Sequence, residues 1–111
     1  MGLFSRVSGL GKLAETYPDP AGDWEYPRLK ETVEVGSVVF QRCAAVAVAD
    51  QGLALRVKGN PPLLLPWSAL RYRRKKRLHW LAAHEYDAGE PAITTLTVMD
   101  GVNEEMKPFL A

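Results

Sequence analysis

Apolar side chains recur at every second position through long stretches of the chain between residues 33 and 98. Successive side chains of a β-strand point to opposite faces of a sheet, so a period of two predicts half-buried strands rather than helices. In the clearest stretch, three apolar residues alternate with two cations: Leu53, Leu55 and Val57 with Arg56 and Lys58. Residues 91–99 are rich in β-branched side chains, which also favours a strand.

Glycine and proline divide this β pattern into short strands. The phase slips at Gly36-Ser37, which predicts a β-bulge, and Asp50-Gln51-Gly52 predicts a turn in which Gly52 takes a positive φ. The segment Gly59-Asn60-Pro61-Pro62 ends a further strand. Turn signals about every 8 to 12 residues, and about six or seven strands in all, predict a mainly β (α+β) domain built as a small antiparallel barrel or sandwich.

Residues 68–86 leave two interpretations open. Ser68 could cap a helix, and Ala, Leu, Arg and Lys are good helix formers. Against a helix, apolar or aromatic side chains alternate over nine residues: Leu78, Trp80, Ala82, His84 and Tyr86. We expect two strands, about 69–74 and 77–86, joined through the basic stretch between them.

The chain begins with a helical pattern. Its stripe consists of Leu3, Val7, Leu10, Ala14 and Tyr17. We expect this amphipathic helix to lie on the barrel or sheet, because Gly9 and Gly11 weaken it by about 1 kcal/mol each. The alternative is an interfacial membrane helix with Phe4 inserted and Arg6 and Lys12 on lipid phosphates.

A proline-rich linker follows the helix. Residues 18–28 hold three prolines, and Trp24 and Tyr26 are expected to pin this segment to one face of the main domain. The predicted organisation is therefore an N-terminal helix and linker in residues 1–28 and a single β domain in residues 29–111.

A short helical turn is expected at the other end of the chain. Asp100-Gly101 is expected to turn the chain, and Asn103 followed by two glutamates is typical of a helix start. Pro108 then cuts the helix short.

Bulk composition limits the possible roles. The chain has 111 residues, of which 47% are hydrophobic, which is enough for one core. A net charge of +1 gives no overall attraction to nucleic acid or membranes. Cys43 is the one cysteine, so no internal disulfide can form, and a small buried hydrophobe is its expected role. Without a long apolar run or a signal-like start, a cytoplasmic protein is expected.

The sequence carries no catalytic or metal-binding pattern. His79 and His84 are five residues apart, so on a strand they face opposite sides, and no cysteine or acid stands at zinc spacing. Ser68 has no obvious base. We therefore expect no catalytic residue, cofactor or metal, and an enzyme of unknown type is the third alternative only.

The strongest local signal is a basic run. Its cations are Arg71, Arg73, Arg74, Lys75, Lys76 and Arg77. At a hairpin tip these charges would project together and could bind the phosphates of an anionic phospholipid or nucleic acid. The alternatives are a solvated hairpin whose charges prevent edge pairing, and neutralisation by the acids at 85, 87, 90, 104 and 105.

Two neighbouring segments resemble a group of small uncharacterised bacterial proteins. The segments are Gly52-Leu53-Ala54-Leu55 and Pro61-Pro62-Leu63-Leu64-Leu65-Pro66-Trp67-Ser68-Ala69-Leu70. The resemblance implies a fold similar to the pleckstrin-homology barrel, in which two orthogonal antiparallel sheets are closed by a terminal helix. Residues 104–110 are too short to close a barrel in that way, so the N-terminal helix is expected to cover the opening.

The expected role is a non-catalytic binding or protein-interaction module. The runner-up is an anionic phospholipid or nucleic-acid binder that uses residues 71–77, peripheral to a membrane in the first case; nucleic acid is the weaker choice because of the low net charge. A homodimer through a strand edge is a further option. Expected core anchors are Trp67, Leu53, Leu55 and Leu65.

Overall fold

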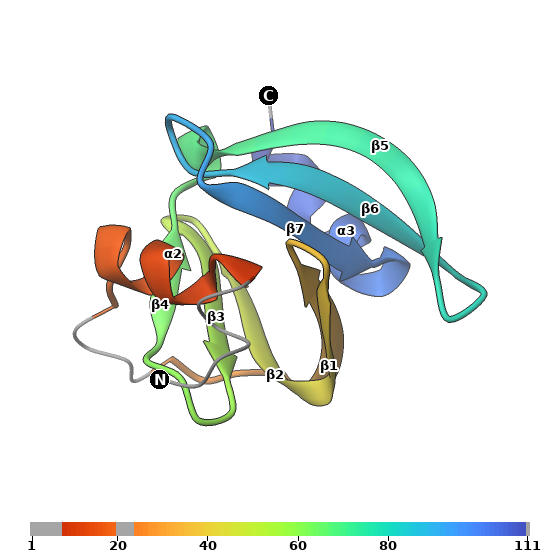
Figure 1. The fold of residues 1–111 in the computed structure, drawn as a ribbon, viewed down its shortest axis with the longest axis horizontal. Helices are drawn as coiled ribbons and strands as arrows, with labels where there is room; N and C mark the ends of the chain where they lie inside the picture. Colours follow the sequence, from red (N-terminus) through yellow and green to blue (C-terminus); the bar gives the residue numbers. More distant parts are fainter. Residues whose placement is uncertain (1–7, 20–23, 111) are drawn as a thin grey trace.

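The computed structural model describes residues 8–19 and 24–110, and these form one curled antiparallel sheet (Figure 1). The strands are β1 (Arg28–Val35), β2 (Val38–Ala49), β3 (Gly52–Val57), β4 (Leu63–Leu65), β5 (Leu70–Leu78), β6 (Leu81–Ala88) and β7 (Thr94–Met99). Their order in the sheet is β4-β3-β2-β1-β7-β6-β5. The sheet is a half-barrel, because β4 and β5 form its two ends and do not pair with each other. The prediction of a mainly β domain with six or seven strands is confirmed.

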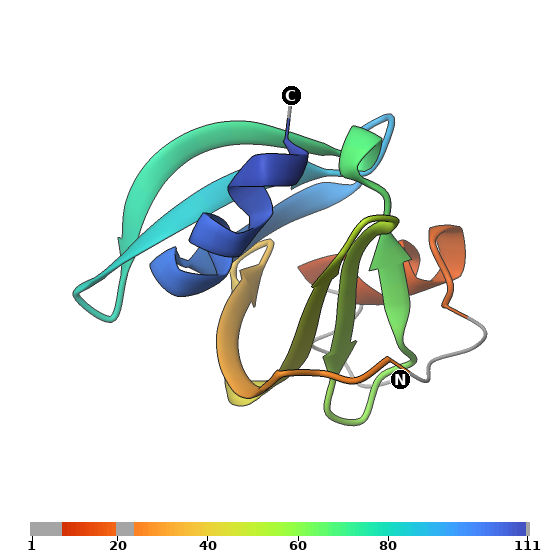
Figure 2. The same cartoon turned by 180° about the vertical axis from the view of Figure 1, so that it is seen from behind.

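Two short helices cover the half-barrel from opposite sides, as Figures 1 and 2 show. The helix α2 (Leu10–Thr16) packs next to β4, and α3 (Asp100–Met106) packs against β6, β7 and β2. Single 3₁₀ turns follow β4, at η1 (Trp67–Ala69), and α3, at η2 (Lys107–Phe109).

The main core lies between the inner face of the sheet and these two helices. Leu53, Leu55 and Leu65 are buried there together with Leu10 and Leu13 of α2. Burial of a leucine side chain contributes about 2 kcal/mol, so the helix gains its stability from docking. The expectation that the N-terminal helix lies on the sheet is confirmed for its described part, whereas Leu3, Phe4, Arg6 and Val7 lie outside the described residues.

A second, smaller cluster covers the outer face of β2 and β3. Its residues are Tyr26, Ala45, Ala47 and Ala54, with Trp24 and Leu64 packed against them. The indole N–H of Trp24 donates a hydrogen bond to Asp19, and the Arg56 guanidinium lies 5.0 Å from the centre of the Tyr26 ring. The two linker aromatics therefore fasten this segment to the sheet, as predicted from their spacing.

The expected bulge at Gly36-Ser37 is wrong, because these residues form the turn of the β1–β2 hairpin. Val35 pairs with Val38, and Gly36 has a φ of 62°, which a hairpin turn requires and glycine adopts at little cost. The phase slip in the sequence thus marks the start of a new strand. The register shifts lie earlier in the same hairpin, between Arg28 and Val33.

Residues 68–86 form two strands, but the turn is not in the basic stretch. Leu78 pairs with Leu81, so His79 and Trp80 alone make the turn, and β5 runs through all of residues 71–77. Pairing across the whole run satisfies more backbone groups than an early turn would. Ser68 lies in η1 rather than at a helix cap.

The C-terminal helix begins three residues before the predicted start. Asp100 and Gly101 belong to its first turn, and Asn103 lies buried inside it. Val102 and Met106 are fully buried, so this short helix packs against the sheet despite its length, while the sheet itself stays an open half-barrel. Pro108 lies in η2, directly after the helix ends.

Candidate functional site

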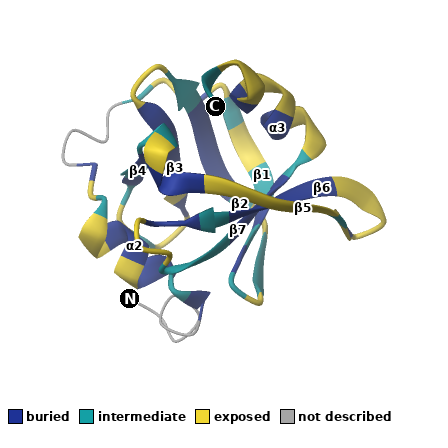
Figure 3. Ribbon diagram, turned by 90° about the horizontal axis from the view of Figure 1, so that it is seen from above, coloured by how far each residue is buried: buried dark blue, intermediate teal, exposed yellow. Residues whose placement is uncertain are grey.

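The basic run lies along β5, at one end of the sheet, where Figure 3 shows a long exposed ribbon. Three of its cations converge on Glu85 of β6. The distances from Arg74, Arg73 and Lys76 nitrogens to Glu85 oxygens are 2.8, 3.4 and 3.7 Å. Glu85 is only 6% exposed, so the three cations neutralise a buried carboxylate.

The charges around Glu85 also set its pKa. Burial by itself would raise the pKa of Glu85, but the hydrogen bond from Arg74 and the charges of Lys76, Arg74 and Arg73 hold it below its usual value. The carboxylate is therefore ionised and forms the centre of a charge cluster on the outer face of the sheet.

Further acids pair with the same cations. Arg73 contacts Asp87 at 3.1 Å, Lys76 contacts Glu34 at 2.6 Å, and Arg71 contacts Glu90 at 3.7 Å. Neutralisation by the acids at 85, 87 and 90 therefore occurs. The acids at 104 and 105 pair elsewhere, with Lys107 and Arg28. Among the described residues, Lys75 and Arg77 are the cations of the run without an acidic partner.

The actual tip of the β5–β6 hairpin is apolar and strained. His79 has a φ of 51° and Trp80 a φ of 69°, the geometry of a two-residue turn that usually holds Asn-Gly. Each residue other than glycine loses about 1 kcal/mol of stability in this left-handed backbone conformation. Trp80 is 89% exposed and Leu81 61% exposed. In Figure 1 this tip extends beyond the rest of the sheet.

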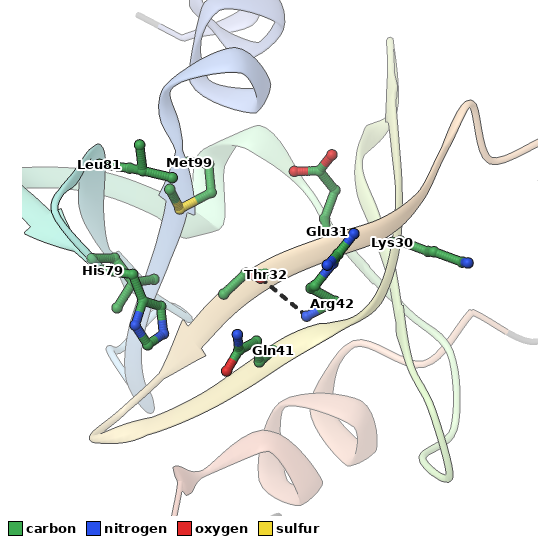
Figure 4. Close-up of a pocket in the computed structure, with 9 residues that line it drawn as sticks. Lys30, Glu31, Thr32, Gln41, Arg42, His79, Leu81 and Met99 are labelled. Atoms are coloured by element: carbon green, nitrogen blue, oxygen red, sulfur yellow. Dashed lines mark hydrogen bonds between the residues drawn. The ribbon is translucent and has the colours of Figure 1, made fainter.

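A hollow of about 310 Å³ separates the hairpin tip from β1 and β2 (Figure 4). Leu81 and His79 line it on the hairpin side, and Lys30 and Arg42 line it on the β1–β2 side. Glu31 also lines it there, and its carboxylate pairs with Arg28 at 3.3 Å. The backbone N–H of Arg42 donates to the Thr32 hydroxyl at 3.0 Å, and Arg42 has a φ of 55°. The bend at Arg42 thus turns this side chain onto the rim of the hollow.

A second hollow, of about 490 Å³, adjoins the first through Lys30 and Arg42. Arg56 and Lys58 of the β3 end also line it, and no carboxylate does. No ion pair joins any of these four cations to an acid within residues 8–19 and 24–110. Leu29, 65% exposed, completes the lining.

We call the surface that joins both hollows and the hairpin tip the cationic face. Its residues are Leu29, Lys30, Arg42, Arg56, Lys58, Trp80 and Leu81. It holds three of the four large hydrophobic side chains that are exposed within the described ranges, the fourth being Tyr72. Leu81 and Leu29 therefore line hollows that also contain cations without an acidic partner among the described residues, and Trp80 adjoins Leu81.

The two histidines do not come together. His79 lies in the exposed turn, whereas His84 is buried on β6, where its Nδ1 is hydrogen-bonded to the Tyr72 hydroxyl at 3.2 Å and its Nε2 donates to Asp100 at 2.9 Å. The described residues contain no cluster of three side chains that could hold a metal ion. The Tyr72–His84–Asp100 chain links β5, β6 and the start of α3.

The expected core anchors differ in their burial. Leu53, Leu55 and Leu65 are fully buried, whereas Trp67 is half-buried at the edge of the core. The Trp67 indole donates to the Ala49 carbonyl at 2.9 Å and stacks on Phe109, with ring centres 5.2 Å apart. Cys43 is also half-buried and packs against the core.

Sequence reasoning missed the cationic face because its members are far apart in the chain. The sequence held one small signal for it: Arg56 and Lys58 occupy the outward positions of an alternating strand. The sequence favoured the basic run as the anion-binding site instead, because its charges are adjacent along the chain.

Comparison with known proteins gives no further guidance. No protein-family model, no curated protein and no solved structure matches this chain. Within the described ranges, no helix is long and apolar enough to cross a bilayer. Functional inference therefore depends on the geometry of the surfaces.

Proposed function

We propose that this chain is a non-catalytic binding module whose cationic face docks on an anionic phospholipid surface, so that the protein is peripheral to a membrane. The observation that carries the proposal is that exposed Leu81 and Leu29 line adjoining hollows together with four cations that have no acidic partner among the described residues. The exposed Trp80 is next to Leu81 in the hairpin turn. The curled antiparallel sheet and its terminal helix are compatible with a barrel similar to the pleckstrin-homology fold, and we extend the proposal to that relationship.

The apolar part of the face suits the bilayer interface. Tryptophan is enriched at this depth because its ring is apolar while its N–H can still be hydrated. Trp80 and Leu81 sit together at the end of a projecting hairpin, where insertion needs no rearrangement of the sheet. Each apolar side chain that leaves water contributes about 25 cal/mol per Å² of buried area.

The cations of the face supply the electrostatic part. Each cation close to an anionic membrane contributes about 1 kcal/mol. Lys30, Arg42 and Lys58 have no acidic partner within the described ranges, so contact with lipid phosphates breaks no ion pair there. The β5 cations Arg73, Arg74 and Lys76 would have to leave Glu85, so residues 71–77 are the poorer lipid site.

Strain in the hairpin turn supports the same view. The fold keeps His79 and Trp80 at positive φ, where Asn-Gly would be more stable. Local strain of this kind is often retained at functional sites. In this proposal the backbone strain is retained because it keeps an exposed tryptophan at the tip of the hairpin.

Co-sedimentation with vesicles tests the proposal. The chain should bind vesicles that contain phosphatidylglycerol and not vesicles of phosphatidylcholine alone. The variants Trp80→Ser/Leu81→Ser and Lys30→Ala/Lys58→Ala should each lose about tenfold or more in partitioning, since two interfacial contacts disappear in each. The charge-matched control Lys12→Ala/Lys75→Ala should bind like the wild type.

Two results would count against the cationic face. If Lys75→Ala/Arg77→Ala loses binding while Lys30→Ala/Lys58→Ala does not, the lipid site belongs to β5. If none of the variants changes sedimentation, or if the wild type ignores anionic lipid, the membrane proposal fails altogether.

A further inference from the structure

The two edge strands of the sheet, β4 and β5, differ in how accessible they are to another chain. At the β4 end, the Leu64 N–H donates to the Tyr17 carbonyl at 3.0 Å, and the Asp19 N–H donates to the Pro62 carbonyl at 3.3 Å. Residues 17–19 thus cover that short edge. At the other end, β5 pairs only with β6, and six of its nine residues are exposed. Such an edge carries N–H and C=O groups that another extended chain can pair.

The charge on this edge comes from Lys75 and Arg77. Directly paired residues of antiparallel strands share a face, and these two lie opposite His84 and Ala82, which are two residues apart on β6. Both cations therefore lie on the face of β5 that carries α3. The remaining cations of β5 pair with acids on the other face or at its margin.

A recess with a mixed lining continues the same face: Tyr72, Tyr86 and Leu110 supply its aromatic and apolar part, and His84, Asn103 and Lys107 its polar part. Tyr72 lies opposite Tyr86, which is two residues beyond His84 on β6. Tyr72 is three residues from Lys75 on β5, and the register shift between Tyr72 and Arg74 accounts for the extra residue. A hollow of about 350 Å³ opens beside Tyr72, between β5, β6 and the C-terminal segment at Lys107 and Leu110. Along this face the edge thus offers a recess walled by two tyrosine rings, followed at alternate positions by two cations without an acidic partner among the described residues.

We infer that β5 binds an extended acidic segment of a partner protein by strand addition. Acidic side chains of the added strand face Lys75 and Arg77, and an apolar side chain at a neighbouring alternate position enters the recess beside Tyr72. Charge selects the partner: a second copy of β5 would bring like charges together, which disfavours pairing of two identical edges.

A labelled peptide tests this inference without any lipid. The probe is a fluorescein-labelled Thr-Glu-Thr-Glu-Thr-Phe-Thr-Glu-Thr-Glu-Thr peptide, whose pattern fits β5 in either direction. Fluorescence anisotropy should detect saturable binding, and the amide resonances that shift and gain exchange protection should be those of β5. Replacing every Glu with Lys, or alternate Thr residues with Pro, should abolish binding, because the first reverses the charge and the second removes backbone donors.

Variants of the chain separate strand addition from nonspecific attraction. Lys75→Glu and Arg77→Glu should each weaken binding of the acidic peptide several-fold, whereas Lys12→Glu, at an exposed position with the same change in net charge, should leave it within about twofold. The inference is overturned if the proline peptide binds as well as the parent, if the shifted amides lie on the cationic face, or if no acidic peptide binds. Vesicle binding does not enter any of these outcomes.

Discussion

The phenol O–H of Tyr86 donates a hydrogen bond to the Asn103 side-chain oxygen, and both residues are buried. Tyr86 lies in the middle of β6, whereas Asn103 lies inside α3, so this bond joins the sheet to the C-terminal helix. Close beside it, His84 holds Asp100 at the start of the same helix. Two polar contacts thus fix where α3 lies on the sheet.

Replacing Tyr86 with phenylalanine should destabilise the fold. Tyr86→Phe leaves the Asn103 oxygen buried without a donor, and the free energy of unfolding should fall by about 1–2 kcal/mol. Urea denaturation monitored by circular dichroism measures this change. Tyr72→Phe, at a half-exposed position, should cost clearly less, and equal losses in the two variants would contradict a special role for the buried bond.

Tyr86 should also make the fold sensitive to alkali. Burial, with a smaller contribution from Tyr72, raises the pKa of Tyr86 from 10.0 to about 12. The unfolded chain therefore releases this proton first, so the stabilisation is complete below pH 10 and is lost as the pH rises towards 12. The loss should be roughly 2–3 kcal/mol in unfolding free energy. Subtracting the pH profile of the unfolding free energy of Tyr86→Phe from that of the wild type isolates this loss. Identical alkaline profiles in the two proteins would refute the assignment.

The Glu85 cluster should give a corresponding effect in acid. Because the pKa of Glu85 is lowered in the folded chain, its stabilisation is present above the ordinary value of 4.5 and is lost as the pH falls below it. Glu85→Gln should reduce the unfolding free energy by about 2 kcal/mol at neutral pH and flatten the acid side of the profile. Glu104→Gln is the control, since its partner Lys107 is exposed, and it should change neither.

Repair of the strained turn should separate stability from binding. His79→Asn/Trp80→Gly should raise the unfolding free energy by about 1–2 kcal/mol, because both positive φ values become favourable. The same variant should lose vesicle binding, because Trp80 is gone. The single His79→Asn variant should gain part of the stability and keep its binding. Wild-type vesicle binding by the double variant would contradict the proposed use of the hairpin tip.

Trp67 should contribute through two distinct contacts. Trp67→Phe removes the hydrogen bond to Ala49 and keeps a ring against Phe109, so a loss of about 1 kcal/mol is expected. Trp67→Ala should cost about 3 kcal/mol, since the stacking and burial also disappear. A double-mutant cycle with Phe109→Ala should give a coupling energy of about 1 kcal/mol. A coupling of zero would show that the stacked rings do not stabilise each other.

Local patterns predicted most of the fold and little of the candidate site. The alternation around Leu53 and Leu55 identified a strand because inward and outward positions are fixed by backbone geometry alone. The position of the β5–β6 turn could not be read in this way, because His79 and Trp80 are not turn-forming residues and only pairing along the whole of β5 makes them the turn. The alternative of one helix through 68–86 is wrong because β5 and β6 pair with each other along their whole length.

The sequence by itself determined the strands of the sheet, the amphipathic helix that docks on it and the main core, since these follow from the spacing of apolar side chains and from turn chemistry. Tertiary structure decided which charges are free. Arg73, Arg74 and Lys76 are adjacent in sequence to Lys75 and Arg77, yet strand pairing places the first three beside a buried carboxylate and leaves the other two unpaired. Lys30, Arg42, Arg56 and Lys58 come from three separate stretches, and the pairing of β1, β2 and β3 brings them together beside Leu29. Electrostatic character depends on distances between residues far apart in the chain, and those distances exist only after folding.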